Sequence, residues 1–209
     1  MSKILIIGKN GNLGSELMSV YANESPTGWD KTDLDVTDEI SVQKKITELK
    51  PSIVFNCTAY NNVDGAEDDY ATAELVNGKA PGYIAKACSD VGAIFIHYSS
   101  GQVFAGINPE GYNEDELPNP VNAYGKSKFL GEQAVATSTD QYYIIRTEWL
   151  YGNGSGKKSF IDIMLEGATL GKSIQGVNDE IGKPTWARDL AQFSRMIVEQ
   201  KEAYGIYHG

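Results

Sequence analysis

The chain has 209 residues, enough for one substantial hydrophobic core and too few for two large domains. Hydrophobic residues make up 41% of the sequence and charged residues 22%, as is usual for globular proteins. The formal net charge of −10 produces an average field that repels nucleic acids and anionic membranes. We therefore expect no nucleic acid and no membrane as a partner.

The few cysteines and histidines exclude two further classes of protein. Cys57 and Cys88 are too few for a disulfide framework, and their apolar surroundings favour reduced, buried thiols. Together with His97 and His208 they match no familiar zinc-ligand spacing, so no metal site is expected. The apolar run at 3–7 is too short for a signal peptide, and no later run reaches spanning length. A cytoplasmic location is therefore the default expectation.

Short β-branched runs alternate with longer amphipathic ones along most of the chain. The pattern predicts strands at 3–7, 52–56, 93–98 and 142–146, and helices at 12–22, 41–49, 71–91 and 123–136. Strand–helix alternation predicts an α/β fold, with a doubly wound parallel sheet covered by helices on both faces.

After residue 147 the sequence becomes rich in glycine and polar residues. The run WLYGNGSGKKSF at 149–160 predicts a glycine-rich loop, which we expect to act as a lid over a bound substrate. The remaining predicted elements are a helix at 160–170, a strand at 173–177, a helix at 189–200 and a strand at 205–207.

A glycine-rich turn separates the first predicted strand from the first predicted helix. Gly8, Gly11 and Gly14 form the pattern G-x-x-G-x-x-G at this junction. Such a turn lets the backbone approach a dinucleotide pyrophosphate at a free helix N-terminus. A plain tight turn would explain one of the glycines but not three. The sequence therefore predicts a dinucleotide-binding site here.

The stretch GWDKTDLDVTD holds the residues expected near the adenosine end of the cofactor. Asp30 would accept a hydrogen bond from the ribose of NAD, whereas Lys31 would pair with the 2′-phosphate of NADP. The sequence leaves both NADH and NADPH open. Asp35 and Val36 are candidates for contact with the adenine, although Asp35 would equally serve to start the next helix.

A tyrosine and a lysine stand four residues apart in the segment PVNAYGKSK, where a helix is predicted to begin. Residues i and i+4 share a helix face, so Tyr124 and Lys128 point toward the same place. An ammonium about 4 Å away, at an effective dielectric constant of about 20, contributes on the order of 4 kcal/mol. That is enough to lower a phenol pKa from about 10 to about 7. The spacing therefore suits proton transfer.

Six segments, in order, carry a family resemblance. They are NCTAYNNVDGAE, ELVNGKAPGYIAKAC, FIHYSSGQVFAG, PVNAYGKSKFLGE, IIRTEWLYG and DEIGKPTWARDLA, spread over nearly the whole chain. With the glycine turn they resemble the dTDP-4-dehydrorhamnose reductase family of the extended short-chain dehydrogenase/reductases. The resemblance implies an NAD(P)-binding Rossmann domain at 1–147 and a small, incomplete substrate-binding lobe with a lid at 148–186. The helix and strand at 187–209 would return to the Rossmann domain.

The resemblance also implies an activity, the NAD(P)H-dependent reduction of the 4-keto group of a nucleotide-linked 6-deoxy sugar in surface polysaccharide biosynthesis. Tyr124 would give a proton to the ketone as hydride arrives, Lys128 would lower the tyrosine pKa and hold the nicotinamide ribose, and Ser100 would orient the carbonyl. Tyr124 and Lys128 are also implied cofactor contacts. The other implied cofactor contacts are Gly8, Asn10, Gly11, Asn12, Leu13, Asp30, Lys31, Asp35, Val36, Ala59, Tyr60 and Tyr98. The implied substrate contacts are Asn61, Val63, Ser100, Gln102 and Trp149.

Two features depart from the family pattern. The family motif Ser-Thr-Asp-Tyr-Val-Phe reads Ser-Ser-Gly-Gln-Val-Phe at 99–104, which keeps the hydroxyl at Ser100 but loses an acidic and an aromatic group. Gly101 also loosens the loop backbone. Family members continue for several dozen residues past the segment that reads GIYHG here, so the substrate half is expected to be incomplete.

Other functions on the same fold stay open. A dinucleotide-binding regulatory subunit without turnover would explain the changed motif and the short substrate half. A nucleotide-sugar epimerase or dehydratase would keep its cofactor bound, although dehydratases usually carry an acid pair in the loop held here by 99–102. The expected partner is a nucleotide-sugar substrate, with a homodimer as a further candidate. Glu16 matches a position that binds a metal at a dimer contact in some relatives, and we expect it on a solvated helix face.

Overall fold

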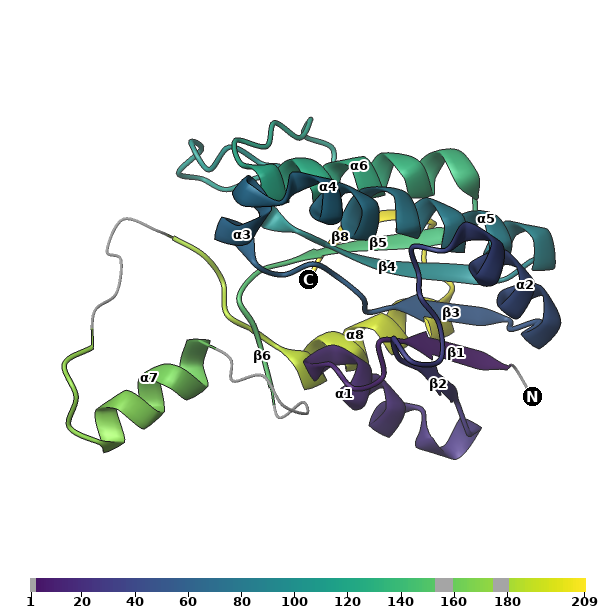
Figure 1. Ribbon diagram of the computed structural model, residues 1–209, viewed down its shortest axis with the longest axis horizontal. Coiled ribbons are helices and arrows are strands. Elements are labelled where there is room, and N and C mark those ends of the chain that lie inside the picture. Colours follow the sequence, from purple (N-terminus) through teal and green to yellow (C-terminus); the bar gives the residue numbers. More distant parts are fainter. Residues whose placement is uncertain (1–2, 153–159, 175–180) are drawn as a thin grey trace.

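The computed structural model describes residues 3–152, 160–174 and 181–209. Within these ranges a parallel sheet of six strands has the order β2-β1-β3-β4-β5-β8 (Figure 1). The strands are β1 (Ile4–Ile7), β2 (Thr27–Trp29), β3 (Ile53–Asn56), β4 (Ile94–Ser100), β5 (Tyr142–Thr147) and β8 (Gly205–His208). The strand order reverses between β1 and β3. In open sheets of this kind, ligands bind outside the carboxyl ends of the strands at such a reversal.

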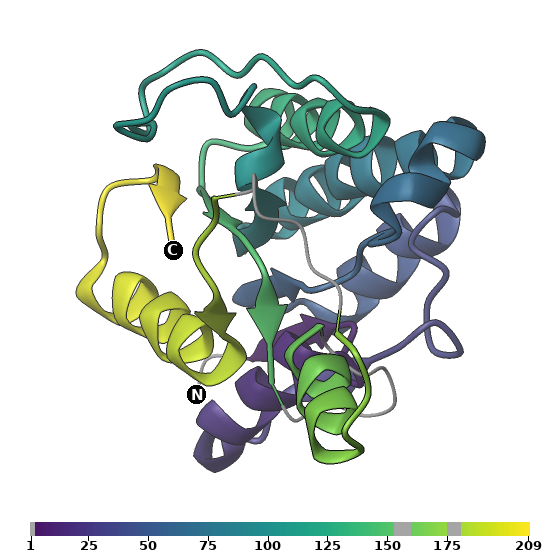
Figure 2. The same ribbon diagram turned by 90° about the vertical axis from the view of Figure 1, so that its left-hand side faces the viewer.

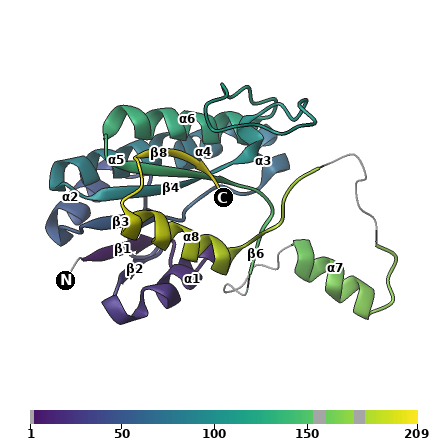
Figure 3. The ribbon, with the colours of Figure 1, turned by 180° about the vertical axis from the view of Figure 1, so that it is seen from behind.

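Helices cover both faces of the sheet, as Figures 1 and 3 show. On one face lie α1 (Asn12–Val20) and α8 (Ala187–Gln200), and on the other lie α2 (Glu39–Leu49), α5 (Ala80–Val91) and α6 (Ala123–Ser138). Shorter helical turns are η1 (Ala22–Glu24), α3 (Val63–Asp68), α4 (Tyr70–Ala73), η2 (Glu74–Lys79) and η3 (Gly101–Val103). This arrangement confirms the predicted α/β, Rossmann-type doubly wound sheet.

The central strands are apolar on both faces because both faces are covered. In β1, Leu5 and Ile7 pack in the cluster beneath α2 and α5, whereas Ile4 and Ile6 pack in the cluster beneath α1 and α8. A strand buried on both faces needs a continuous apolar run, so ILII shows no alternation of polar and apolar residues. Truncating one of these side chains to alanine would cost about 2–5 kcal/mol.

Several short elements escape prediction from the sequence. β2 reads Thr-Gly-Trp and is a strand because it pairs with β1, where Leu5 lies opposite Thr27. The helix predicted at 71–91 is observed as α4, η2 and α5, in which η2 is a π-helix. A local π-helix leaves the amphipathic pattern nearly unchanged, so periodicity did not reveal it. β4 and β5 also run further than predicted, to Ser100 and Thr147.

A smaller parallel sheet joins β6 (Leu150–Tyr151) to β7 (Thr185–Trp186), visible as neighbouring arrows in Figure 2. Helix α7 (Phe160–Thr169) confirms the predicted helix and lies apart from the main sheet in Figures 1 and 3. Most of the predicted lid loop, and 175–177 of the strand predicted at 173–177, fall outside the described residues, and 173–174 form no strand. In the described ranges no helix is long and apolar enough to cross a membrane.

Candidate active site

The predicted site residues follow the carboxyl ends of adjacent strands. Gly8 follows β1, Ala59, Tyr60 and Asn61 follow β3, Ser100 ends β4, and Trp149 comes two residues after β5. The strands are parallel neighbours in the sheet, so these turns meet along one edge of it. This edge is where a doubly wound sheet binds its ligand.

The glycine turn after β1 approaches neighbouring backbone closely. Gly8 has a φ of +86°, and a Cβ there would lie 3.1 Å from the carbonyl carbon of Cys57. A Cβ at Gly14 would lie 2.1 Å from the carbonyl oxygen of Gly8, so α1 starts pressed against the turn. Gly11, the N-cap residue, supplies no side-chain cap to the first N–H groups of α1. Such N–H groups are the ones that bind a pyrophosphate in folds of this type.

Asp30 connects the end of β2 to the glycine turn. Its Oδ2 accepts a hydrogen bond from Asn10 Nδ2 at 2.6 Å, and its Oδ1 accepts from the hydroxyl and the backbone N–H of Thr32 at 2.7 and 2.8 Å. The hydrogen bonds from Thr32 are the main reason that the pKa of Asp30 is lowered. The neighbouring Lys31 is exposed. An ionised carboxylate and an exposed lysine are thus neighbours in the chain, and both cofactors stay open.

The two residues predicted near the adenine have different surroundings. Asp35 is exposed and accepts hydrogen bonds from the backbone N–H and hydroxyl of Thr37 at 3.0 and 2.7 Å. It does not start the next helix, because the N-cap of α2 is Asp38. Val36 is buried in the hydrophobic cluster with residues of α2 and α5. Their contact with an adenine stays a prediction.

A cavity of about 480 Å³ opens beside the turn after β3 and is lined by Ala59, Tyr60, Asn61 and Asn62. The cavity brings together predicted cofactor contacts, Ala59 and Tyr60, and a predicted substrate contact, Asn61. Asn62 also caps α3 by accepting a hydrogen bond from the N–H of Gly65 at 3.1 Å. Val63, another predicted substrate contact, is the first residue of α3 and is half-buried.

Sequence reasoning missed Asn77, which holds this turn in place from the π-helix η2. Its side chain is 1% exposed, and it forms hydrogen bonds with both backbone polar groups of Tyr60 and with the hydroxyl of Ser127. A π-helix often marks a functional position. A polar residue at an inward-facing position of the helix pattern was the one signal that could have drawn attention to it.

Ser100, Tyr124 and Lys128 come together where the end of β4 meets the first turns of α6. The hydroxyl of Ser100 accepts a hydrogen bond from the N–H of Gln102 at 3.2 Å and lies near enough to the Tyr124 hydroxyl to lower the pKa of that phenol. Lys128 is buried, and its ammonium donates a hydrogen bond to the carbonyl of Tyr98 at 2.6 Å. The geometry therefore joins the predicted carbonyl-orienting hydroxyl to the predicted proton donor.

The start of α6, which positions Tyr124, is fixed by three side chains. Asn122 caps the helix by accepting a hydrogen bond from the N–H of Gly125 at 2.7 Å, and it donates one to Gln102 at 2.9 Å. Glu67 on α3 accepts a hydrogen bond from the N–H of Ala123 at 2.7 Å. Loss of an N-cap side chain typically costs about 1 kcal/mol.

The pKa of Tyr124 corrects the expectation from sequence. Burial raises it above its ordinary value, and the nearby Ser100 hydroxyl opposes that rise. Lys128 does not bring this phenol near neutrality, because its own ammonium is desolvated and donates to the Tyr98 carbonyl. Burial lowers the pKa of Lys128 to about 8, against a smaller opposing effect of Glu132. Tyr124 consequently keeps its proton at neutral pH, as a proton donor must.

The remaining predicted cofactor and substrate contacts do not gather in one place. The Tyr98 side chain lies in the cluster beneath α1 and α8 and donates to Ser194 at 2.8 Å, so its link to the site is its carbonyl. Leu13 is buried in the same cluster. Gln102 is half-buried beside the N-cap of α6, and Trp149 is 50% exposed with a φ of +43°.

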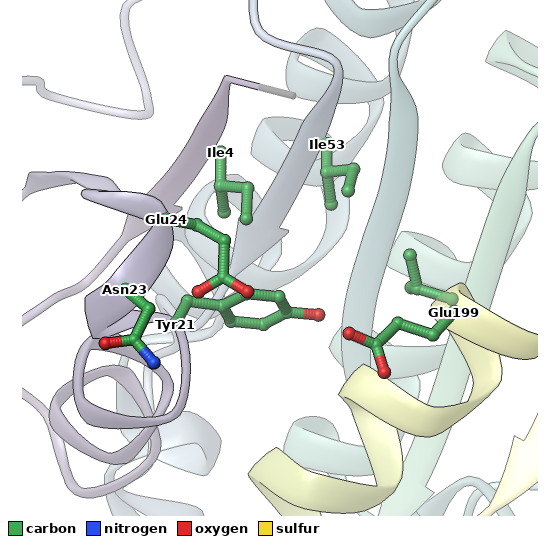
Figure 4. Close-up of a pocket in the computed structure, with 7 residues that line it drawn as sticks. Ile4, Tyr21, Asn23, Glu24, Ile53 and Glu199 are labelled. Atoms are coloured by element: carbon green, nitrogen blue, oxygen red, sulfur yellow. The ribbon is translucent and has the colours of Figure 1, made fainter. Parts of the chain in front are cut away.

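A second cavity, of about 370 Å³, lies at the amino ends of β1 and β3 (Figure 4). Its lining includes Ile4 and Ile53 at the sheet edge, together with Tyr21, Glu24 and Glu199. In Figure 4 the hydroxyl of Tyr21 points toward the Glu199 side of the cavity. This is the opposite edge of the sheet from Ser100 and Tyr124, so we assign it no part in the chemistry there.

The described part of the chain holds no cluster of histidine, cysteine, aspartate or glutamate side chains suited to a metal ion. Glu16 on α1 is instead paired with Arg188 on α8 at 3.2 Å. Cys57 and Cys88 are free thiols, as predicted, and burial raises the pKa of both.

Known proteins are similar to this chain over nearly its whole length. The profile of the RmlD substrate binding domain matches residues 2–209. The chain is 40% identical over 192 residues to a dTDP-4-dehydrorhamnose reductase of Burkholderia thailandensis, which covers 90% of this chain and 63% of that protein. It is 35% identical over 210 residues to the spore coat polysaccharide biosynthesis protein SpsK of Bacillus subtilis, covering 100% of this chain and 73% of that protein.

Solved structures agree with the sequence matches. A dTDP-4-dehydrorhamnose reductase from Bacillus anthracis in complex with NADP superposes with a TM-score of 0.95 at 36% identity, over 100% of this chain and 74% of that one. Its Clostridium acetobutylicum counterpart gives 0.93 at 36% identity, over 99% and 73%. The chain thus spans between 63% and 74% of the length of these relatives. On the profile match and these identities, the chain belongs to the RmlD substrate-binding domain family.

Proposed function

We propose that this chain transfers hydride from NADH or NADPH to the 4-keto group of a nucleotide-linked 6-deoxy sugar, as dTDP-4-dehydrorhamnose reductases do. The observation that carries the proposal is that the Ser100 hydroxyl lies near the Tyr124 hydroxyl at the start of α6, with Lys128 one helical turn further along the helix. The pair stands at the same sheet edge as the glycine turn and the 59–62 cavity.

The residues at the turn after β1 fit a dinucleotide. Any side chain at Gly8 or Gly14 would fill the space in which the turn, α1 and the turn after β3 meet. The uncapped N-terminus of α1 and the carboxylate of Asp30 lie where a pyrophosphate and a ribose would be held. When bound, the nicotinamide supplies the hydride that the ketone carbon receives.

The protein side of the reaction is a proton transfer. Tyr124, protonated because its pKa is raised, would give its hydroxyl proton to the ketone oxygen while Ser100 holds that oxygen by a hydrogen bond. Lys128, with a pKa of about 8, would be mostly cationic at pH 7 and would hold the nicotinamide ribose through a hydrogen bond from its ammonium. Positioned general acids of this kind contribute about 10²–10⁴-fold to a rate.

For the substrate, we propose that the 59–62 cavity together with Gln102 and Trp149 holds the sugar nucleotide, and that 148–186 forms part of a substrate-binding lobe. The relatives include SpsK, a polysaccharide biosynthesis protein. That name supports the same process for this chain.

The test is oxidation of NADPH and, separately, NADH by the purified chain with dTDP-4-dehydrorhamnose. Tyr124→Phe should lower kcat by about 10²–10⁴-fold, far more than it weakens cofactor binding. Tyr204→Phe, on an exposed tyrosine of the opposite edge, is the matched control and should turn over like the wild type. Equal rates for wild type and Tyr124→Phe would refute the mechanism.

Two other outcomes separate the alternatives. Tight cofactor binding without reduction of any keto sugar would indicate a regulatory subunit. Conversion of a sugar nucleotide without net oxidation of NADPH or NADH would indicate an epimerase or dehydratase.

A further inference from the structure

Two residues leave the main sheet side by side next to the predicted catalytic hydroxyl. β4 and β5 are parallel neighbours in which Ser100 lies opposite Thr147. The residues that follow them, Gly101 and Glu148, therefore stand next to each other at the carboxyl edge. Gly101 also directly follows Ser100, whose hydroxyl lies near that of Tyr124.

The Glu148 carboxylate lies directly over Gly101. A Cβ built on Gly101 would lie 2.2 Å from Oε1 and 2.6 Å from Cδ of Glu148. Gly101 does not have a left-handed φ, so the position needs glycine for space and not for backbone conformation. The carboxylate occupies the volume that a side chain at position 101 would fill.

A second glycine bounds the carboxylate on its other side. A Cβ on Gly182 would lie 3.1 Å from Oε2 of Glu148 and 2.8 Å from the ring of Trp149. Trp149 follows Glu148 with a φ of +43°, an outlier for a bulky residue. Strain of this kind persists where the surrounding structure imposes it, and it gathers at functional sites.

Among residues 3–152, 160–174 and 181–209, the Glu148 carboxylate takes part in no hydrogen bond and no ion pair, although it is half-buried. Within that part of the chain its full acceptor capacity is available. An ionised carboxylate accepts hydrogen bonds through two oxygens with about four lone-pair sites. Hydroxyl groups of a sugar are the matching donors, and bonds to a charged acceptor are about twice as strong as neutral ones.

We propose that Glu148 is a specificity-determining residue, whose carboxylate binds ring hydroxyls of the sugar whose ketone lies at Ser100 and Tyr124. The inference rests on the proposed function, since it names a contact in the same site. An acceptor-only group selects for a sugar that presents a hydroxyl there and against one that lacks it. Loss of one charge-assisted hydrogen bond corresponds to about tenfold to hundredfold in affinity.

The first experiment measures binding by calorimetry, with the protein saturated with NADP⁺. dTDP-rhamnose and dTDP are titrated in parallel. The ratio of their two dissociation constants, called the sugar ratio below, gives the contribution of the sugar to binding. Glu148→Ala and Glu148→Gln should weaken dTDP-rhamnose by about tenfold to hundredfold and leave dTDP unchanged. Glu48→Ala, which removes an exposed glutamate on α2, is the control and should change neither.

A second variant displaces the carboxylate without removing it. Gly101→Ala places a methyl group where Oε1 now lies, so the Glu148 side chain must swing away. Its loss of dTDP-rhamnose affinity should match that of Glu148→Ala. The double variant should be no weaker than either single one, because both changes remove the same contact. If the double variant loses affinity for dTDP-rhamnose by the product of the two single losses, the proposed geometry is wrong.

These measurements separate this inference from the proposed reaction. If Glu148→Ala binds dTDP-rhamnose as tightly as the wild type does, or if the wild type gains nothing from the sugar, the role of Glu148 is wrong. If the sugar ratio falls in Glu148→Ala but the wild type reduces no keto sugar, Glu148 stands as a sugar contact and the proposed reaction fails. Turnover with an unchanged sugar ratio leaves the reaction in place and overturns the role of Glu148.

Discussion

The side-chain amide of Asn77 pairs with both backbone polar groups of Tyr60, accepting from its N–H at 2.8 Å and donating to its C=O at 3.0 Å. A third hydrogen bond, at 3.0 Å, reaches the hydroxyl of Ser127 on α6. The same helix carries Tyr124 and Lys128. Asn77 therefore links the wall of the 59–62 cavity to the helix of the proposed proton donor, and we regard it as a positioning residue.

Replacing Asn77 by alanine should leave the backbone of Tyr60 without its partners. An unsatisfied buried polar group costs about 1–3 kcal/mol, so Asn77→Ala should lower the free energy of unfolding by at least that amount. The looser cavity wall should raise KM for the sugar nucleotide more than it lowers kcat.

Chemical denaturation and steady-state kinetics check both effects. Asn77→Asp, which buries a carboxyl group against the Tyr60 carbonyl, should be at least as destabilising as Asn77→Ala. Asn119→Ala, at an exposed asparagine, is the control. An Asn77→Ala protein with wild-type stability and KM would remove the positioning role.

The buried Lys128 ammonium should lower the free energy of unfolding at neutral pH. Its pKa falls from an ordinary value of 10.5 to about 8, so the folded state binds this proton less tightly than the unfolded state does. The cost, about 3 kcal/mol, is complete below pH 8, fades as the pH rises toward 10.5, and is absent above that value.

Lys128→Met should therefore be inactive yet more stable than the wild type at pH 7. Loss of the charge-assisted hydrogen bond to the Tyr98 carbonyl offsets about 1.5–2 kcal/mol, which leaves a net gain of about 1–1.5 kcal/mol. At pH 10 the gain should have largely disappeared. Urea denaturation at the two pH values measures this, with Lys126→Met on the exposed face of α6 as the control. A Lys128→Met protein that is less stable than wild type at pH 7 would refute the argument.

Asp30 should favour the binding of NADH, and Lys31 should favour the binding of NADPH. The Asp30 carboxylate suits a free ribose hydroxyl, and its charge repels a 2′-phosphate, so Asp30→Ala should weaken NADH binding and spare or improve NADPH binding. Lys31→Ala should weaken NADPH binding by up to about fivefold, because an exposed ion pair contributes up to about 1 kcal/mol. Fluorescence titration of the two cofactors measures both changes. Equal losses for both cofactors in each variant would show that neither residue contacts the ribose.

The local features of this protein were readable from its sequence. The apolar run of β1, the glycine turn and the start of α6 each depend on residues close together in the chain, so composition and spacing identified them. The i, i+4 spacing of Tyr124 and Lys128 likewise placed them on one face of α6. The direction of the tyrosine pKa shift was not readable, because it depends on burial, which the rest of the fold provides.

The relationships that shape the proposed site are long-range. β2 exists as a strand through its pairing with β1, and Asn77 acts on Tyr60 only because a π-helix and a turn meet. In the sequence, Gly101 replaces the aspartate of the family motif, so this position appears only as the loss of an acidic group. The structure brings the carboxylate of Glu148 over Gly101, because the register of β4 and β5 sets these distant residues side by side. Sequence determined the local chemistry of this protein, and only the packing of its strands decided which groups share one site.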